Sequence, residues 1–238
     1  MTRSRLTRLA PFAFVFMLAS PLPAAASLIQ DTPFFQDFSG TGLGAVNTVL
    51  TVQRTPAAPS PAGTESGCSA AGVCPTGVAG GDEKTGAGQT GNPTFAELGI
   101  ATASQIRVVF NANEPQNGGT PTITLDRLVL TILDPTASTI LAEFSTTGAV
   151  TVDTSVEPGV GNAGWVFRLD AAQAAIAQTF VSGGNRVGLG ANLSDASGGP
   201  ETFFVASGQA LQASEPGLFA MAGGLLTFAA MIGRRLKS

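Results

Sequence analysis

The chain is dominated by short segments with strand character that are separated by turn-forming residues. The clearest is 122–133, where apolar side chains recur at every second position on both faces. Strands are predicted at 46–53, 105–112, 122–133, 140–144, 149–153, 164–169, 186–193 and 202–206. Gly-, Pro- and Asn-rich turns lie between them, at 113–119, 157–159 and 182–185. This pattern predicts a mainly β protein, specifically an antiparallel β-sandwich of jelly-roll-like type.

Strict alternation within 122–133 predicts which side chains of that strand share a face. Leu128, Leu130 and Ile132 are predicted on one face. The opposite face is predicted to carry Ile123, Leu125, Arg127, Val129, Thr131 and Leu133. A charged side chain, that of Arg127, is thus expected among apolar ones.

One segment has helical rather than strand character. Asp170 is a good N-cap residue, because its carboxylate can accept a hydrogen bond from a free backbone N–H of the first turn. The Ala-rich run 171–178 that follows consists of strong helix formers. A single short helix is therefore predicted here.

The region 55–94 is rich in Pro, Ala, Gly, Ser and Thr and lacks periodicity, so an irregular loop is predicted there. It contains Cys68 and Cys74, the two cysteines of the chain. Exposed cysteines so close in sequence are predicted to form a disulfide in an oxidising compartment. A metal pair would need two further ligands, and the chain has no His to supply them. The spacing also differs from that of a C-x-x-C thiol exchanger.

The first 26 residues have the organisation of a secretion signal. Three arginines precede the short apolar run 9–18, and prolines then interrupt any helix. Ala24 and Ala26 supply the small residues that a signal peptidase requires, which predicts cleavage before Ser27. An uncleaved anchor is the alternative.

The C-terminal end carries a second apolar run, 217–233, without any charged residue. Its 17 residues would extend about 26 Å as a helix, at the short limit for crossing a bilayer. Arg234, Arg235 and Lys237 follow directly. Cations after an apolar span hold that end in the cytoplasm, which predicts a transmembrane helix with the preceding domain outside.

The tail has three parts: Ser214, Glu215, Pro216 and Gly217, then the apolar run, then the basic cluster. Segment 214–238 resembles a PEP-CTERM sorting signal, with Ser214 in place of the first proline of the usual triplet. This resemblance implies processing by an exosortase, a membrane-embedded cysteine transpeptidase-like enzyme. It also implies a surface or matrix protein of a Gram-negative bacterium that makes exopolysaccharide.

Residues 27–213 are left as the exported β-rich domain. Its acidic residues outnumber its basic ones by more than two to one, and no basic cluster lies within it. Such a domain repels nucleic acid and anionic membranes, so neither is an expected partner of the domain itself. No motif for a cofactor is present, and none is expected.

The residue inventory argues against an enzyme. Without His, the chain has no Ser-His or Cys-His nucleophile pair, and Lys84 lies in an acidic loop cluster typical of solvated charge. Carboxylates that a glycosidase-like site could use are scattered along the chain: Asp126, Glu143, Asp153, Asp170 and Glu201. No metal site is expected, although Asn192, Asp195 and Glu201 offer oxygens that a calcium ion could use.

Two functions of different classes remain open at this point. The first is a non-catalytic surface or extracellular-matrix protein, tethered by its tail to the inner membrane before processing and then released to the surface, with exopolysaccharide as an expected partner. The second is a carbohydrate-binding module or carbohydrate-active enzyme acting on secreted polysaccharide. An exposed aromatic platform would favour the binder, and Trp165 with Phe167 is its candidate, although a core position is commoner for such residues.

Overall fold

A computed structural model describes residues 27–37, 48–55, 60–70, 72–86, 88–114, 121–155 and 163–208. Its strands are β1 (Ser27–Asp37), β2 (Thr48–Val52), β3 (Thr64–Cys68), β4 (Ile106–Asn111), β5 (Thr122–Leu133), β6 (Ile140–Thr146), β7 (Val150–Asp153), β8 (Ala163–Leu169), β9 (Arg186–Ser194) and β10 (Glu201–Ser207). A short 3-10 helix, η1 (Ala103–Gln105), precedes β4, and α1 (Ala171–Gln178) follows β8. The predictions of a mainly β protein and of one short α-helix are confirmed.

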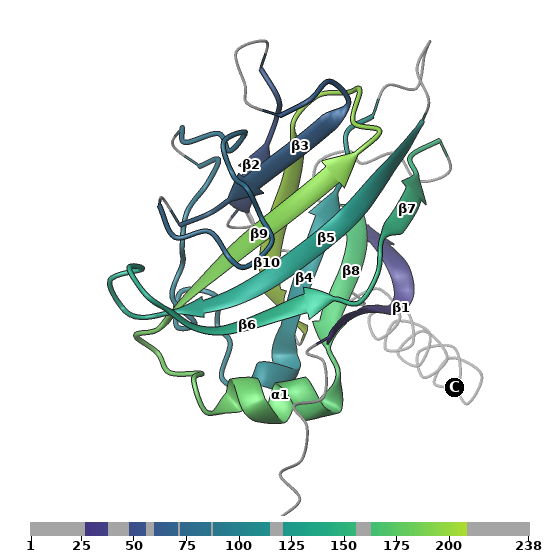
Figure 1. The fold of residues 1–238 in the computed structure, drawn as a ribbon. Coiled ribbons are helices and arrows are strands. Elements are labelled where there is room, and N and C mark those ends of the chain that lie inside the picture. Colours follow the sequence, from purple (N-terminus) through teal and green to yellow (C-terminus); the bar gives the residue numbers. More distant parts are fainter. Residues whose placement is uncertain are drawn as a thin grey trace, which may run out of the picture.

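The strands form one sheet in the order β2-β10-β4-β8-β1-β6-β5-β9-β3, with β7 paired to β5. β1 pairs in parallel with β6 and antiparallel with β8, so it joins the two halves of the sheet. This single sheet curls until β2 and β3 come together (Figure 1). The right-handed twist between neighbouring strands allows such a long sheet to close on itself.

The curled sheet is flattened into two layers around one core. Figure 1 shows β9, β5 and β6 crossing in front of β10, β4 and β8, with α1 below them. Large side chains buried between the layers come from both halves: Leu50, Ile106, Phe110, Ile123, Leu125, Leu128, Leu130, Ile132, Phe144, Phe167 and Phe203. The curled sheet is called the barrel below. Its interior is a packed core rather than a channel.

The predicted faces of β5 are wrong for half of the strand. Ile123 and Leu125 lie in the core together with Leu128, which strict alternation placed on the opposite face. The cause is a β-bulge, since the register against β9 shifts between Leu125 and Arg127. A bulge adds one residue to a strand and thereby reverses the faces beyond it.

The helix begins where the sequence predicted. The Asp170 carboxylate accepts a hydrogen bond of 2.8 Å from the backbone N–H of Gln173, and this bond holds the pKa of Asp170 below its usual range. The hydroxyl of Ser27 donates to the same carboxylate at 2.9 Å. The N-cap therefore also anchors the start of β1.

Residues 82–84 lie between β2 and β3, the two edge strands of the sheet, and this junction is called the seam below. They belong to the region 55–94, which was predicted to be irregular. The backbone N–H of Asp82 donates to the Ser66 carbonyl of β3, and the carbonyl of Asp82 accepts from Gln53, just after β2. The N–H of Lys84 donates to the Thr51 carbonyl of β2. Residues 82–84 therefore complete the barrel with main-chain hydrogen bonds, and β3 itself lies within the predicted loop 55–94.

The predicted signal 1–26 and sorting tail 214–238 lie outside the described residues. The same holds for the predicted span 217–233 and its basic cluster. Within the ranges that the structure describes, no helix is long and apolar enough to cross a membrane.

Candidate functional site

Three glutamates line one end of the barrel interior, and each continues the inward-facing series of its own strand. In β10, Glu201 precedes the core residues Phe203 and Val205 by two and four positions. Beyond β4, Glu114 follows the core residues Phe110 and Ala112 in the same alternation. In β3, Glu65 shares a face with Gly67, where an added Cβ would lie 2.9 Å from the Val52 side chain. Because alternate residues of a strand share a face, all three carboxylates are directed inward.

These carboxylates are withdrawn from water. The side chain of Glu201 is 0% exposed, that of Glu114 is 4% exposed and that of Glu65 is 6% exposed. Within the described part of the chain, neither oxygen of Glu201 has a hydrogen-bond partner, and Glu65 Oε2 is also unpaired. Burying unpaired charged groups is costly, so this arrangement requires a physical compensation.

Partial compensation comes from backbone groups. Glu65 Oε1 accepts a hydrogen bond of 3.0 Å from the backbone N–H of Arg54. Both oxygens of Glu114 accept from the backbone N–H of Ser197 at 3.1 Å, and the Ser197 hydroxyl donates at 2.7 Å. No described Arg or Lys side chain forms an ion pair with any of the three, and the Arg54 guanidinium donates to the Ser60 carbonyl instead.

Desolvation therefore dominates the electrostatics of Glu201 and raises its pKa to about 11. Contact with the Glu65 side chain and the charges of Glu65 and Glu114 raise the pKa further, and the backbone N–H of Glu201 opposes this weakly. A second buried carboxylate beside the first disfavours ionisation, because two like charges in a low-dielectric site repel strongly. The surroundings of Glu201 therefore favour the neutral form of its carboxyl group.

The disulfide-bearing loop covers the outer face beside this acidic end. Cys68 and Cys74 form the predicted disulfide, with their Cα atoms 5.3 Å apart. Cys68 is buried rather than exposed, because the loop packs onto the sheet. An added Cβ at Gly190 of β9 would collide with Pro75, so glycine permits this close approach.

An open hollow of about 350 Å³ lies between this loop and residues 60–64. Polar groups of β3, β9 and the β5 bulge line it, among them Ser66, Asn192 and Asp126. The Ser66 hydroxyl donates to Asn192 Oδ1 at 2.8 Å, and the Asn192 amide donates to the Gly77 carbonyl at 2.8 Å. Asp126 is exposed, and one of its oxygens accepts from the Ser194 hydroxyl at 3.0 Å. The hollow can offer an anionic acceptor and an amide to a polar ligand.

Most of the predicted acidic candidates do not come together. Glu143 accepts from the backbone N–H of Thr76 on the outer side of β6, and Asp170 caps α1. Asp153 is exposed at the end of β7, where hydrogen bonds from Ser155 lower its pKa. Glu201 does meet other carboxylates, but its partners Glu65 and Glu114 were not among the candidates.

The two other predicted ligand sites are not assembled. Trp165 is only 7% exposed and packs near Phe110 in the core, with ring centroids 6.0 Å apart, and Phe167 is fully buried. Asp195 is exposed and accepts from Thr124, while Glu201 is interior, so the run 192–201 does not converge on one point. Over the described residues, no group of three or more His, Cys, Asp or Glu is arranged to hold a metal ion.

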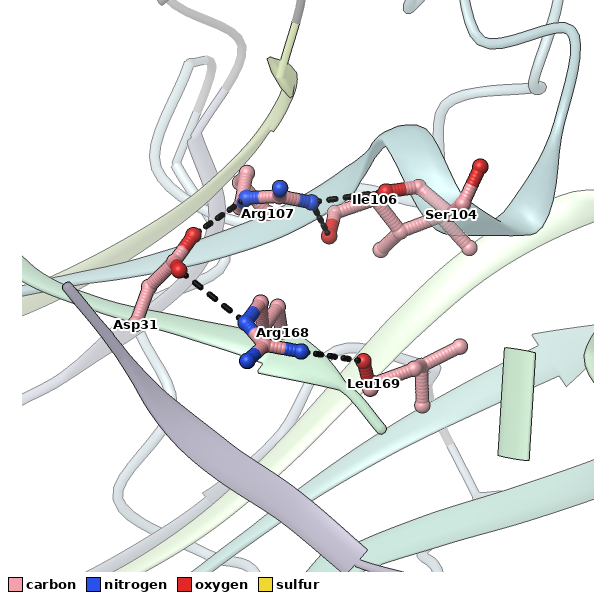
Figure 2. A network of polar contacts seen from close by, with 6 residues as sticks. All are labelled: Asp31, Ser104, Ile106, Arg107, Arg168 and Leu169. Carbon is pink, nitrogen blue, oxygen red and sulfur yellow. Dashed lines mark hydrogen bonds and ion pairs between the residues drawn. The ribbon is translucent and has the colours of Figure 1, made fainter. Parts of the chain in front are cut away.

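The opposite end of β4 carries a carboxylate that is fully paired. Figure 2 shows Asp31 of β1 between two arginines, with its oxygens 2.5 Å from Arg107 Nε and 3.0 Å from Arg168 Nε. Arg107 also donates to the carbonyls of Ser104 and Ile106. This cluster ties β1 to β4 and β8, which is a structural role.

Comparison with known proteins adds no functional assignment. No protein family, curated protein or solved structure matches the chain.

Proposed function

We propose that the chain is an exported, non-catalytic protein of the cell surface or extracellular matrix, sorted by a PEP-CTERM-like tail. The observation that carries the proposal is the three-part organisation of 214–238, together with the secretion signal in 1–26. The curled sheet would serve as the jelly-roll-like sandwich that the sequence predicted, since its halves pack face to face over one core.

The disulfide of the described domain supports a location in an oxidising compartment outside the cytoplasm. Its disulfide joins Cys68 and Cys74, and such bonds persist in oxidising compartments. Signal peptidase and an exosortase-type enzyme are the proposed processing partners. Exopolysaccharide is the proposed binding partner at the cell surface. The inner membrane would hold the chain through 217–233 until the tail is processed.

The acidic end offers little support for glycosidase chemistry. A glycosidase holds its two carboxyl groups roughly 5–10 Å apart, on either side of a sugar. Glu65 and Glu201 are instead buried and in side-chain contact, an arrangement that does not match this spacing. We therefore favour a protein without hydrolytic activity.

Replacing Glu215 and Pro216 by Ala tests the proposal in the producing cell. The variant should be exported and lose its signal, yet remain in the membrane at its tail-bearing mass. Gln212→Ala, just before the motif, is the matched control and should mature normally. Processing of the double variant to the same shortened species as the wild type would refute the sorting proposal.

Polysaccharide binding at the hollow is a second candidate. It is favoured by the exposed Asp126 carboxylate beside the Asn192 amide, because such groups recognise neighbouring sugar hydroxyls. Asp126→Ala should weaken binding to exopolysaccharide from the producing cells by about tenfold, the effect of losing a charged hydrogen bond. Asp153→Ala, on an exposed strand end, is the control, and equal binding by both variants would exclude the hollow.

A further inference from the structure

The strongest unexplained feature of the molecule is the group of buried oxygens beside the barrel seam. Three oxygens of Glu65 and Glu201 lack a partner in the described ranges, although both side chains are more than nine-tenths buried. An ionised carboxylate can accept hydrogen bonds but cannot donate one. Two ionised carboxylates in contact therefore cannot form a hydrogen bond with each other. A single proton between them changes one into a donor.

We propose that Glu201 is held as a neutral carboxylic acid whose O–H donates to Glu65 Oε2, forming a proton latch beside the β2–β3 seam. This hydrogen bond satisfies Glu65 Oε2 and leaves the pair with a single negative charge. The other oxygen of Glu65 already accepts a hydrogen bond from the backbone N–H of Arg54, which follows β2. The latch therefore links β10 and β3 across the end of β2.

The charged groups around the latch all oppose ionisation of Glu201 or are engaged elsewhere. Glu65 approaches from β3, and Glu114 approaches from the segment after β4. Asp82, in the closing segment, is 4% exposed, and its Oδ2 accepts from Ser66 N at 2.9 Å and from the Ser60 hydroxyl. Its Oδ1 has no hydrogen-bond partner among the described residues. Arg54 follows β2, and its guanidinium donates to the Ser60 carbonyl at 2.8 Å.

The latch makes the seam sensitive to alkali. Loss of the proton would place two charges in contact inside the barrel, next to a closure that depends on a few main-chain bonds of residues 82–84. Separation of the seam would free the edges of β2 and β3, and unpaired edges can pair with other strands. The inference is independent of the proposed function, because it concerns the closure of the barrel alone.

Thermal unfolding of the purified chain between pH 5 and pH 9 tests the latch. Glu201 binds a proton more tightly in the folded than in the unfolded state, so stability should fall as pH rises through this range. The wild-type Tm should drop by roughly 10 °C. Glu201→Gln keeps a donor but cannot ionise, so its Tm should fall much less and exceed that of wild type at pH 9. Glu143→Gln, on the outer side of β6, should behave like wild type.

A second measurement needs no variant. Hydrogen exchange of the wild type at pH 6 and pH 9, corrected for intrinsic rates, should show loss of protection at Gln53, Asp82 and Lys84 before β5. A flat wild-type Tm, or uniform loss of protection, would overturn the proposal. So would a rise in Tm with added Ca²⁺ that Glu201→Gln abolishes, because the acids would then hold a cation in place of a proton.

Discussion

The two ends of β4 hold carboxylates in opposite electrostatic settings. Near its start, Asp31 is charged and lies between the guanidinium groups of Arg107 and Arg168. Beyond its end, Glu114 lies near the buried Glu201. No cationic side chain of the described residues forms an ion pair with either glutamate. The same strand therefore supports one site stabilised by ion pairs and another in which a proton compensates the charge.

The difference predicts opposite responses to pH. At the end that carries α1, Asp170 has a lowered pKa, so it contributes stability above its ordinary pKa that is lost as pH falls through the folded value. At the seam, Glu201 has a raised pKa of about 11, so stability is lost as pH rises above the ordinary Glu value. We expect maximal stability in mildly acidic solution, between these two ranges.

Asp31→Ala should break the paired end and have the largest effect. It leaves two arginines facing each other with side chains 18% and 38% exposed, and we expect a loss of about 3 kcal/mol in the free energy of unfolding. Urea unfolding at pH 7 measures it. Arg168→Gln is the control and should cost less, because the more exposed Arg168 is solvated and Arg107 still pairs with Asp31. Equal losses would show that the pairing is not the source of stability.

Glu65→Gln, at the seam, should raise the stability of the protein by an intermediate amount at alkaline pH. The amide removes a like charge and can donate to an ionised Glu201, while its oxygen still accepts from Arg54. We expect about 1–2 kcal/mol of added stability at pH 8, the scale of a hydrogen bond to a charged group. At pH 5 the variant should gain nothing. Stabilisation of the same size at both pH values would point to packing rather than charge.

Asp170→Ala should have the smallest effect, about 1 kcal/mol, through loss of the N-cap of α1. The loss should be present at pH 7 and shrink as the solution is acidified, since the protonated wild-type carboxyl is a poorer acceptor. Asp170→Asn keeps an accepting oxygen and serves as the control. A constant loss down to pH 2 would contradict the assigned role of the charge.

Sequence patterns predicted the strands with clean alternation and the capped helix, because these signals are local. β3 has the sequence TESGC and was missed, since it is buried by a loop rather than by apolar residues of its own. β1 was missed as well, and its register against β8 shifts between Gln30 and Phe35. The β5 bulge could not be predicted either, because it depends on pairing with β9.

The acidic end was harder to predict than the fold. Glu65, Glu114 and Glu201 come from distant parts of the chain, and the topology of the sheet brings them together. A local signal did exist: the alternation Phe110, Ala112 continues to Glu114, and Glu201 begins the series of Phe203. A glutamate in register with core residues is therefore a useful indicator of a buried acid.

The proton latch depends above all on the protonation state of Glu201. Carbon-13 NMR of the chain with labelled Glu side-chain carboxyls, assigned through Glu201→Gln, would follow each group from pH 3 to pH 11. We expect one carboxyl resonance, absent from Glu201→Gln, that keeps the shift of a protonated acid through pH 8. A Glu201 resonance that titrates between pH 4 and pH 5, like that of an exposed glutamate, would contradict the presence of a proton latch.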